Sequence, residues 1–337
     1  MCAKKVCIVG AGAMGGSFAA LLDRAGHAVR AVDNRAAHVA AIERDGLRMT
    51  GALGEHWARI EVSTGEALEA GWADWVIVFT DTNGTRAAGE IAKSVMAADG
   101  CTVTMQNGIG NVDALCDILG HGTMGREKVL GGSSMCSAAV MAPGHVVFTH
   151  HGPTTLGELD GTRSERLNAL VELLSSAGLD IAVSGDIHGK IWNKFILNCG
   201  VNALCAVSGM RSGEMARVPE LYALQDRIID EALAVAAAKG IVLPDKDIRT
   251  TVKKAAFYRF NKPSMLQHIE AGKKTEIDAI NGALVREAKA VGIAVPYNEA
   301  LVALLKGVET RRRREEEGMD IDYDGWEARI QDEPLPD

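Results

Sequence analysis

Three polar side chains in the middle of the chain have the types and the spacing of a small catalytic group. Lys194, Asn198 and Asn202 follow one another at intervals of four residues in an otherwise apolar helical pattern over residues 191–202. Residues at this interval lie on one face of a helix. A lysine there can donate a proton, and the two amides can hold a carboxylate or a carbonyl without adding charge. Alternatively, the three residues form an exposed polar stripe on an amphipathic helix.

A glycine-rich turn near the N-terminus predicts a dinucleotide site. Residues 6–9 are continuously apolar, as in a buried parallel strand, and a helical pattern covers residues 17–25. In a G-x-G-x-x-G turn the first glycine permits the tight turn and the second lets a pyrophosphate approach. The third lets the helix pack closely on the strand, and the helix N-terminus offers N–H groups to the anion. The turn reads Gly10-Ala11-Gly12-Ala13-Met14-Gly15.

The residues after the second predicted strand bear on the choice of dinucleotide. This strand, residues 28–32, ends at Asp33. A carboxylate there accepts hydrogen bonds from the ribose hydroxyls and repels a 2′-phosphate, which favours NAD(H). Asn34 and Arg35 follow at once, and Arg35 can reach a 2′-phosphate. NAD(H) is therefore preferred over NADP(H), which stays the alternative.

Two further predicted strands end in polar residues. Residues 75–79 lead to Asp81, and residues 101–105 lead to Asn107, which is followed by a glycine. In open α/β sheets, ligands bind beyond the carboxyl ends of the strands. Asn107 is therefore a candidate to face the nicotinamide or the substrate, and the alternative is an ordinary Asn-Gly turn.

The rest of the pattern divides the chain in two. We expect a dinucleotide-binding α/β domain over residues 1–185, an all-helical domain over residues 186–317 and a tail over residues 318–337, with the Lys194 helix at the seam. Further strands are expected over residues 134–140, 145–148, 154–158 and 180–183, and further helices over residues 163–177, 221–238, 248–257, 275–291 and 298–311.

Composition excludes several classes of partner. The 337 residues are 47% hydrophobic and 24% charged, as in an ordinary globular protein, and the net charge is −8. The basic run from Arg311 to Arg314 is followed directly by three glutamates that compensate its charge, so we expect no nucleic-acid partner. The seven cysteines lack a C-x-x-C pair, which favours reduced residues of a cytoplasmic protein. The chain has no apolar run of about 18 residues and no signal-peptide pattern. His150 and His151 point to opposite faces of a strand, so no metal site is expected.

At this point the chain is seen to resemble the ketopantoate reductase family over roughly residues 4–315. The later stretches and their spacing to the Lys194 helix are distinctive, whereas the glycine turn alone is not. The matching stretches are the glycine turn, residues 106–110, Trp192-Asn193-Lys194 with Asn198 and Asn202, residues 261–267, residues 272–278 and Asn281-Gly282.

The resemblance implies a Rossmann-like domain followed by an all-α domain like the C-terminal domain of 6-phosphogluconate dehydrogenase. It implies NAD(P)H-dependent reduction of a 2-oxo acid, of the ketopantoate type, to a D-2-hydroxy acid. Lys194 would be the general acid, and Glu276 would hold the hydroxyl end of the substrate. Substrate contacts would come from Asn107, Asn198, Asn202, Asn261 and Ser264, and cofactor contacts from residues 10–15, Asp33, Asn34, Arg35, Asp81, Asn107 and Glu276. We also expect a homodimer.

The residue types support this chemistry by themselves. A hydride delivered to a ketone leaves an alkoxide, which needs a proton donor and a positive field. Burial in a cleft lowers the pKa of a lysine such as Lys194 toward the range that a donor needs. Ser264 can donate a hydrogen bond to a substrate carboxylate, and Glu276 can accept one from a hydroxyl and orient the ammonium. The alternative for Glu276 is an acid in the first turn of a helix, favoured by the dipole.

Two departures from the family pattern keep other functions open. Members that use NADPH carry an arginine at the position of Asp33 and usually a lysine at that of Asp81. One alternative is an NAD-dependent D-2-hydroxy acid dehydrogenase for a bulkier substrate. Another is a dinucleotide-binding redox sensor without catalysis. His268 replaces an aspartate of many relatives and is expected behind the residues that touch the substrate, and Tyr323 and Trp326 mark the tail as a docked segment or an arm onto a partner subunit.

Overall fold

An eight-stranded sheet organises the N-terminal part of the chain. The computed structural model describes residues 3–65, 68–120, 123–319 and 322–330. Neighbouring strands of this sheet run parallel, except that β8 and β11 are antiparallel. The order is β12-β11-β8-β7-β6-β1-β2-β5, formed by β1 (Lys5–Val9), β2 (Ala28–Val32), β5 (Glu61–Ser63), β6 (Ala73–Val78), β7 (Met96–Thr104), β8 (Val129–Ser134), β11 (Thr154–Gly157) and β12 (Ile181–Val183).

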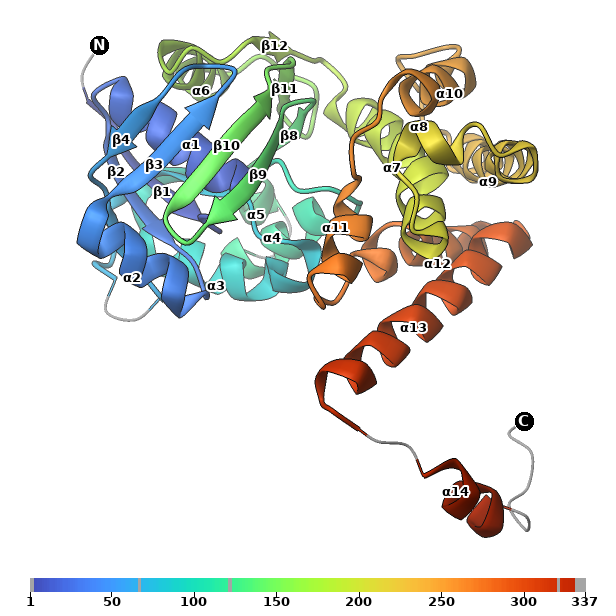
Figure 1. Cartoon of the computed structure of the whole chain (residues 1–337). Coiled ribbons are helices and arrows are strands. Elements are labelled where there is room, and N and C mark those ends of the chain that lie inside the picture. Colours follow the sequence, from blue (N-terminus) through green and yellow to red (C-terminus); the bar gives the residue numbers. More distant parts are fainter. Residues whose placement is uncertain (1–2, 66–67, 121–122, 320–321, 331–337) are drawn as a thin grey trace.

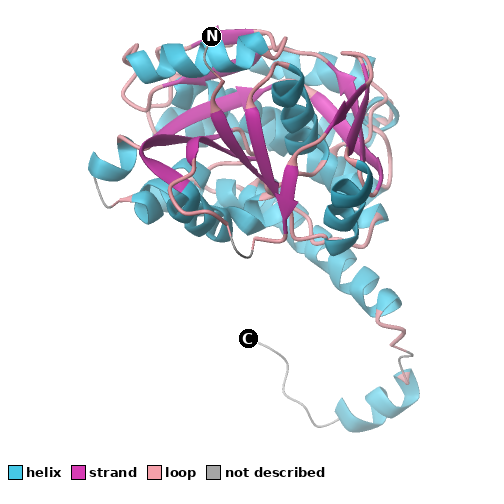
Figure 2. Cartoon of the chain, turned by 90° about the vertical axis from the view of Figure 1, so that its left-hand side faces the viewer, coloured by secondary structure: helices cyan, strands magenta, loops and turns pink. Residues whose placement is uncertain are grey.

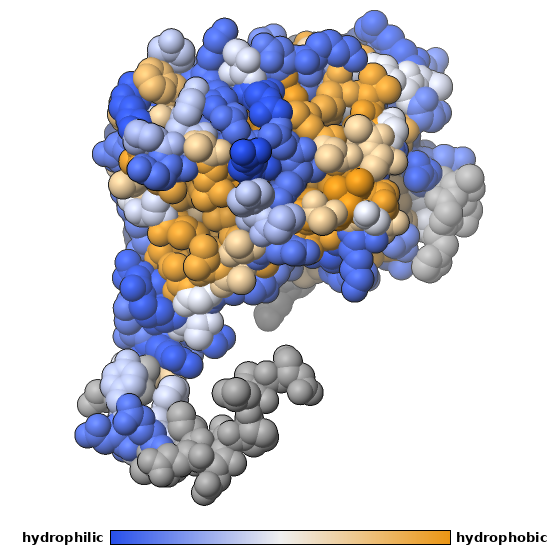
Figure 3. Space-filling view, turned by 90° about the vertical axis from the view of Figure 1, so that its right-hand side faces the viewer, coloured by the Kyte–Doolittle hydropathy of each residue, from blue (hydrophilic) through white to orange (hydrophobic). Residues whose placement is uncertain are grey.

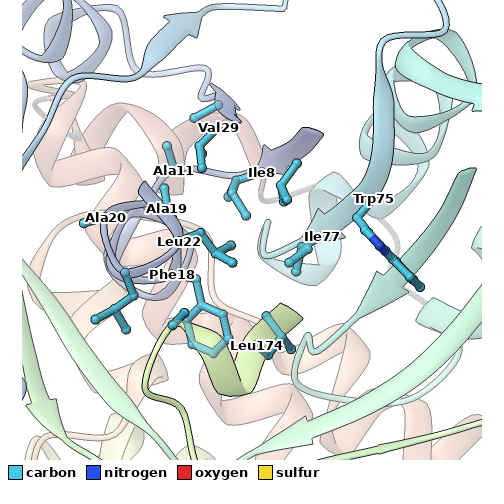
Figure 4. Close-up of a cluster of buried hydrophobic side chains, with 14 of the residues drawn as sticks. Ile8, Ala11, Phe18, Ala19, Ala20, Leu22, Val29, Trp75, Ile77 and Leu174 are labelled. Atoms are coloured by element: carbon cyan, nitrogen blue, oxygen red, sulfur yellow. The ribbon is translucent and has the colours of Figure 1, made fainter. Parts of the chain in front are cut away.

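Helices cover both faces of this sheet because its central strands are apolar on both sides. Side chains alternate between the faces of a strand. On β1, Ile8 packs with α1 (Ala13–Arg24) and α6 (Glu165–Ser176), while Val9 packs with α3 (Thr85–Val95) and α4 (Asn111–Leu119). Figure 4 shows the first cluster, in which Phe18 and Leu174 meet the sheet. The parallel sheet is thereby buried, and its strand ends carry the polar residues.

A second, four-stranded sheet lies over α1. Its order is β4-β3-β10-β9, and β10 pairs parallel with β3 and antiparallel with β9. Only the hairpin of this sheet was expected from the sequence, and its first strand begins at Ser137 and not at Ser134 as expected. Ser134 ends β8 of the large sheet, and the chain then crosses to the small sheet, where β9 begins. The strands are β3 (Leu47–Gly51), β4 (His56–Ala58), β9 (Ser137–Ala142) and β10 (His145–His150), and α2 (Ala36–Asp45) precedes them.

The C-terminal part consists of helices around α7 (Ile187–Ser208), which Figure 1 shows at the centre of this half. The side chain of Asp186 caps α7 by accepting a hydrogen bond from the Gly189 N–H. Phe195, Ile196 and Cys199 are fully buried against the surrounding helices. These are α8 (Ser212–Met215), α9 (Pro219–Ala238), α10 (Ile248–Tyr258), α11 (Ser264–Glu270), α12 (Asn281–Val291) and α13 (Pro296–Glu316). The predicted α/β and all-α organisation is confirmed.

The helix expected over residues 275–291 is divided in the structure. A short 3-10 turn, η2 (Ile277–Ala279), is followed by a break at Ile280, where φ is −108° and ψ is −97°. Asn281 then begins α12, and its side-chain amide donates hydrogen bonds to the Cys199 carbonyl and to Asn298. These buried bonds set the start of α12 by contacts with α7 and α13. Glu276 consequently lies ahead of the helix and not in its first turn.

The end of α13 projects from the body of the molecule, and α14 (Tyr323–Ile330) lies apart from it (Figures 1 and 2). The guanidinium of Arg314 lies 5.5 Å from the ring centroid of Trp326, which joins α14 to α13. Residues 331–337 of the tail lie outside the described part. In the described ranges, no helix has the length and the apolar character needed to cross a membrane.

Candidate active site

A cleft of about 750 Å³ lies between the two halves of the molecule. The α/β half contributes the start of α1, the segments after β6 and β7, and the crossing from β8 to β9. The helical half contributes α7 and the segment that leads into α11. The predicted site residues that line this cleft are Ala13, Met14, Asp81, Asn107, Lys194, Asn198, Asn202, Asn261, Ser264 and Glu276.

The glycine turn is held by backbone contacts. A Cβ on Gly10, whose φ is +97°, would lie 2.6 Å from the Thr80 nitrogen, and one on Gly15 would lie 1.9 Å from the Gly10 oxygen. A Cβ on Gly12 would meet only the Arg35 Nη2, at 3.5 Å. No side chain of the described residues caps the N-terminus of α1, so its first N–H groups are left for a ligand. The turn therefore fits a pyrophosphate close to Gly12.

Asp33 and Arg35 form a compact pair directly after β2. The Arg35 guanidinium donates to both Asp33 carboxylate oxygens, at 2.7 and 2.8 Å, and the Arg35 N–H donates at 3.0 Å. Burial acts to raise the pKa of Asp33, but the hydrogen bonds and charge of Arg35 hold this pKa below its usual value. Asn34, between them, is exposed. Arg35 is therefore engaged by Asp33 and is not extended toward a ribose phosphate.

Lys194 lies on the face of α7 that borders the cleft. Its ammonium donates a hydrogen bond of 2.7 Å to the carbonyl of Ser134, at the end of β8. Burial lowers the pKa of Lys194 from 10.5 to about 8, and the negative charge of Glu276 acts in the opposite direction. Glu276 is itself buried and accepts a hydrogen bond from the Thr82 N–H. The ammonium is thus oriented by a backbone carbonyl, for which the sequence holds no signal, while Glu276 acts on it through charge.

Two amides on α7 are linked to α11. The Asn202 amide nitrogen donates to the Asn198 oxygen at 3.0 Å, and the Asn202 oxygen accepts from the Ser264 hydroxyl at 3.2 Å and the Met265 N–H at 3.4 Å. The Asn198 amide nitrogen is buried and has no partner among the described residues. A buried donor without a partner is unfavourable by about 1–3 kcal/mol. Asn202 therefore builds the wall, and Asn198 presents a donor for a ligand.

Other predicted residues lie at the rims of the cleft. The Asn261 side chain accepts from the Ser212 hydroxyl at 3.2 Å, which ties the segment before α11 to α8. The backbone oxygen of Asn107 accepts from Asn111, while Asp81 is exposed and caps the turn Thr82–Gly84. His268, expected behind the contact residues, also lines the cleft. These residues border the cleft from three separate segments of the chain.

Gln106 is a residue for which the sequence suggested no role. Its amide nitrogen donates to the Thr80 carbonyl and to the Thr85 hydroxyl, and its oxygen accepts from the Thr104 hydroxyl. It thereby joins the ends of β6 and β7 beneath Asn107. Its place directly after a buried strand was the available signal, because polar residues there meet at one edge of a parallel sheet. Among the described residues, no group of three or more metal-ligating side chains is present.

Comparisons with known proteins agree over almost the whole chain. The family models "Ketopantoate reductase PanE/ApbA" and "Ketopantoate reductase PanE/ApbA C terminal" match residues 6–161 and 186–309. The 2-dehydropantoate 2-reductase of Archaeoglobus fulgidus is 33% identical over 91% of this chain and 98% of its own length.

Solved structures show the same similarity. A PanE/ApbA family ketopantoate reductase from Ralstonia eutropha superimposes with a TM-score of 0.83 at 31% identity, covering 92% of this chain and 99% of its own. A D-mandelate dehydrogenase, solved with NADH and anilino(oxo)acetate, superimposes with a TM-score of 0.83 at 28% identity, covering 91% of this chain and 99% of its own.

Proposed function

The chain belongs to the ketopantoate reductase family, and from this premise we propose that it reduces a 2-oxo acid of the ketopantoate type to the D-2-hydroxy acid. It is an oxidoreductase acting on a CH–OH group, with a nicotinamide dinucleotide as cofactor. The observation that carries the proposal is the position of Lys194. Its ammonium, with a pKa lowered to about 8, borders the same cleft as the start of α1 and the Asn198 amide, whose nitrogen has no partner in the described part of the chain.

The residues of the cleft support a division of roles. The bound cofactor supplies a hydride to the keto carbon, and negative charge then develops on the keto oxygen. The Lys194 ammonium stabilises this oxygen and transfers a proton to it, while the Ser134 carbonyl keeps the ammonium in place. Asn198 donates a hydrogen bond to the substrate carboxylate, and the Ser264 hydroxyl exchanges its bond with the Asn202 oxygen for one to the same carboxylate. Glu276 accepts a hydrogen bond from the substrate hydroxyl. Asn107, Asn202 and Asn261 complete the substrate contacts.

We propose NAD(H) as the preferred cofactor. The Asp33 carboxylate follows β2, where the ribose hydroxyls of a dinucleotide bind, and Arg35 is bound to that carboxylate. Asp81, at the end of β6, adds a second negative charge near the glycine turn. The D-mandelate dehydrogenase that resembles this chain was solved with NADH. Asp33→Ala would release Arg35 and is expected to raise kcat/KM with NADPH relative to kcat/KM with NADH. A wild-type protein with the higher kcat/KM for NADPH would contradict the proposed preference for NAD(H).

A second candidate keeps the fold and changes the substrate. The similarity to D-mandelate dehydrogenase and the acidic residues Asp33 and Asp81 favour an NAD-dependent D-2-hydroxy acid dehydrogenase for a bulkier acid. Steady-state assays with ketopantoate, pyruvate, 2-oxoisovalerate and phenylglyoxylate, each with NADH and NADPH, distinguish the two. The highest kcat/KM with phenylglyoxylate would favour the second candidate. If no 2-oxo acid is turned over, the remaining alternative is a redox sensor.

We also propose a homodimer formed through the helical half. Large apolar side chains are exposed there, including Val242, Tyr258 and Phe260 at 63%, 74% and 50%. Figure 3 shows apolar patches on the right-hand side of Figure 1, where the helical half lies. Exposed apolar area of this kind marks sites of association. Light scattering coupled to size-exclusion chromatography is expected to give twice the mass of the chain, and a monomer at micromolar concentration would contradict the proposal.

A further inference from the structure

One buried histidine joins the glycine turn to the second sheet. His38 lies in the first turn of α2 and is only 3% exposed. One ring nitrogen, Nε2, lies 3.0 Å from the Ala11 carbonyl oxygen, and the other, Nδ1, lies 3.1 Å from the Gly144 nitrogen. Ala11 is part of the glycine turn, and Gly144 lies in the turn between β9 and β10. A single imidazole therefore connects three segments of the chain.

The two partners determine the protonation state of the ring. A backbone carbonyl can only accept, so Nε2 must carry the hydrogen, and a backbone N–H can only donate, so Nδ1 must be unprotonated. The ring is therefore neutral. A second proton, on Nδ1, would face the Gly144 N–H and break that hydrogen bond. Burial lowers the pKa of His38 below its usual value, and the positive charge of Arg35 acts in the same direction.

The hydrogen bond to Ala11 has a consequence for the next peptide group. The Ala11 nitrogen donates to the Val32 carbonyl at 3.1 Å, and the Ala11 oxygen is held by His38. Because a peptide unit is planar and trans, holding the Ala11 carbonyl also sets the direction of the Gly12 N–H, which points the opposite way. Gly12 is the position at which the backbone is open to a pyrophosphate. His38 thus orients a donor of the cofactor site without touching the cofactor.

The other partner links the same ring to the cleft. The turn that holds Gly144 packs on α2, since a Cβ on Gly144 would lie 3.1 Å from that of Ala41. The Gly144 carbonyl accepts from the Arg48 N–H, which binds the turn to β3. From this turn β9 runs back to Ser137, which lines the cleft. The imidazole therefore holds the glycine turn and the β9 wall of the cleft in one arrangement.

We propose that neutral His38 is a positioning residue for dinucleotide binding, and that protonation of His38 weakens this binding at acidic pH. The charged groups near the ring are Arg35, ahead of α2, and Asp33, after β2; their effects on the imidazolium are opposite. The glycine turn and the β9–β10 hairpin face the His38 ring with backbone groups, the Ala11 carbonyl and the Gly144 N–H. His145, the neighbour of Gly144, directs its ring to the Thr50 hydroxyl.

The test measures the Kd of NAD⁺ by calorimetry between pH 8 and pH 5, with no substrate present. Binding requires neutral His38. The affinity for NAD⁺ is therefore full at pH values above the pKa of His38 in the folded protein, and it falls at lower pH by up to about tenfold per pH unit. His38→Gln places an amide oxygen and an amide nitrogen at the two hydrogen-bonding positions and cannot titrate. It is expected to bind NAD⁺ as the wild type does at pH 8 and to lose the acid dependence. His38→Ala is expected to bind NAD⁺ about tenfold more weakly than the wild type at pH 8 and to show no acid dependence.

His145→Gln is the matched control, because it makes the same exchange next to Gly144 without touching the glycine turn. It should keep the acid dependence of the wild type. A wild-type Kd that is constant from pH 8 to pH 5 would overturn the proposal without the use of any variant. So would a His38→Gln protein with the acid dependence of the wild type. A wild type that binds no dinucleotide at pH 8 would overturn both this role and the proposed function, whereas pH-independent binding overturns this role alone.

Discussion

The glycine turn and the Lys194 face of α7 line the same cleft, but they are held in different ways. At the turn, the close approaches of Gly10 and Gly15 are to backbone atoms, and the side chain of His38 binds a backbone carbonyl. On α7, the contacts are between side chains and distant segments. Lys194 binds the carbonyl of Ser134, 60 residues away, and Asn202 binds Ser264, 62 residues away. A backbone site can be recognised from local spacing, whereas a side-chain site exists only once the chain has folded.

The largest expected effect is the loss of the proton donor. Lys194→Ala should lower kcat for reduction by about 10²–10⁴-fold, the usual contribution of a general acid. Lys190→Ala is the matched control, because Lys190 lies one turn earlier on α7 and does not line the cleft. It should leave kcat unchanged. Stopped-flow measurement of NADH oxidation checks both variants. An unaltered kcat for Lys194→Ala would show that Lys194 is not the proton donor.

At the glycine turn the expected effect is on folding as well as on binding. Gly15→Ala puts a Cβ 1.9 Å from the Gly10 oxygen, so the strand, turn and helix must move apart. Overpacking of this kind typically lowers the free energy of unfolding by about 1–3 kcal/mol. Gly12→Ala meets only an arginine side chain and should leave stability nearly unchanged while weakening NAD⁺ binding. Denaturant unfolding measures the stability of both variants. An equal loss of unfolding free energy in Gly12→Ala and Gly15→Ala would contradict the expected difference between the two positions.

The two amides of α7 should separate binding from structure. Asn198→Ala removes a donor that has no partner among the described residues, so KM for the 2-oxo acid should rise about tenfold; it also removes one internal acceptor, that of the Asn202 amide, so the melting temperature should fall slightly. Asn202→Ala removes that donor and also the acceptor of Ser264 and Met265, so it should lower the melting temperature more. Kinetics and thermal unfolding of both variants check this difference. A rise in KM for neither variant would mean that the substrate binds elsewhere.

The smallest expected effect is the pH dependence of the wild type. Reduction needs the protonated form of Lys194, whose pKa is about 8. With NADH saturating, the value of kcat/KM for the 2-oxo acid should therefore be constant between pH 7 and pH 8 and fall by about tenfold per pH unit above pH 8. Glu276→Gln removes a negative charge that raises this pKa, so the decline should begin at lower pH. A profile that stays flat to pH 10 would show that another group supplies the proton.

Sequence reasoning located the cleft residues better than it located their partners. The Lys194, Asn198 and Asn202 face follows from helical spacing, and the glycine turn follows from its order after a strand. The break at Ile280 was missed because the helical pattern of residues 275–291 is continuous in the sequence. The small sheet was missed in part because β3 and β4 are short strands whose pairing with β10 joins distant segments.

By itself the sequence determined the family, the two-part fold and ten of the residues that line the cleft, because these depend on local spacing and on motifs. Tertiary structure alone decided how those residues are held. It bound Arg35 to Asp33, directed Lys194 to the Ser134 carbonyl and placed His38 between the glycine turn and the β9–β10 hairpin. The physical reason is that backbone carbonyls and N–H groups are the same in every residue. Which of them accepts or donates depends on how distant segments pack.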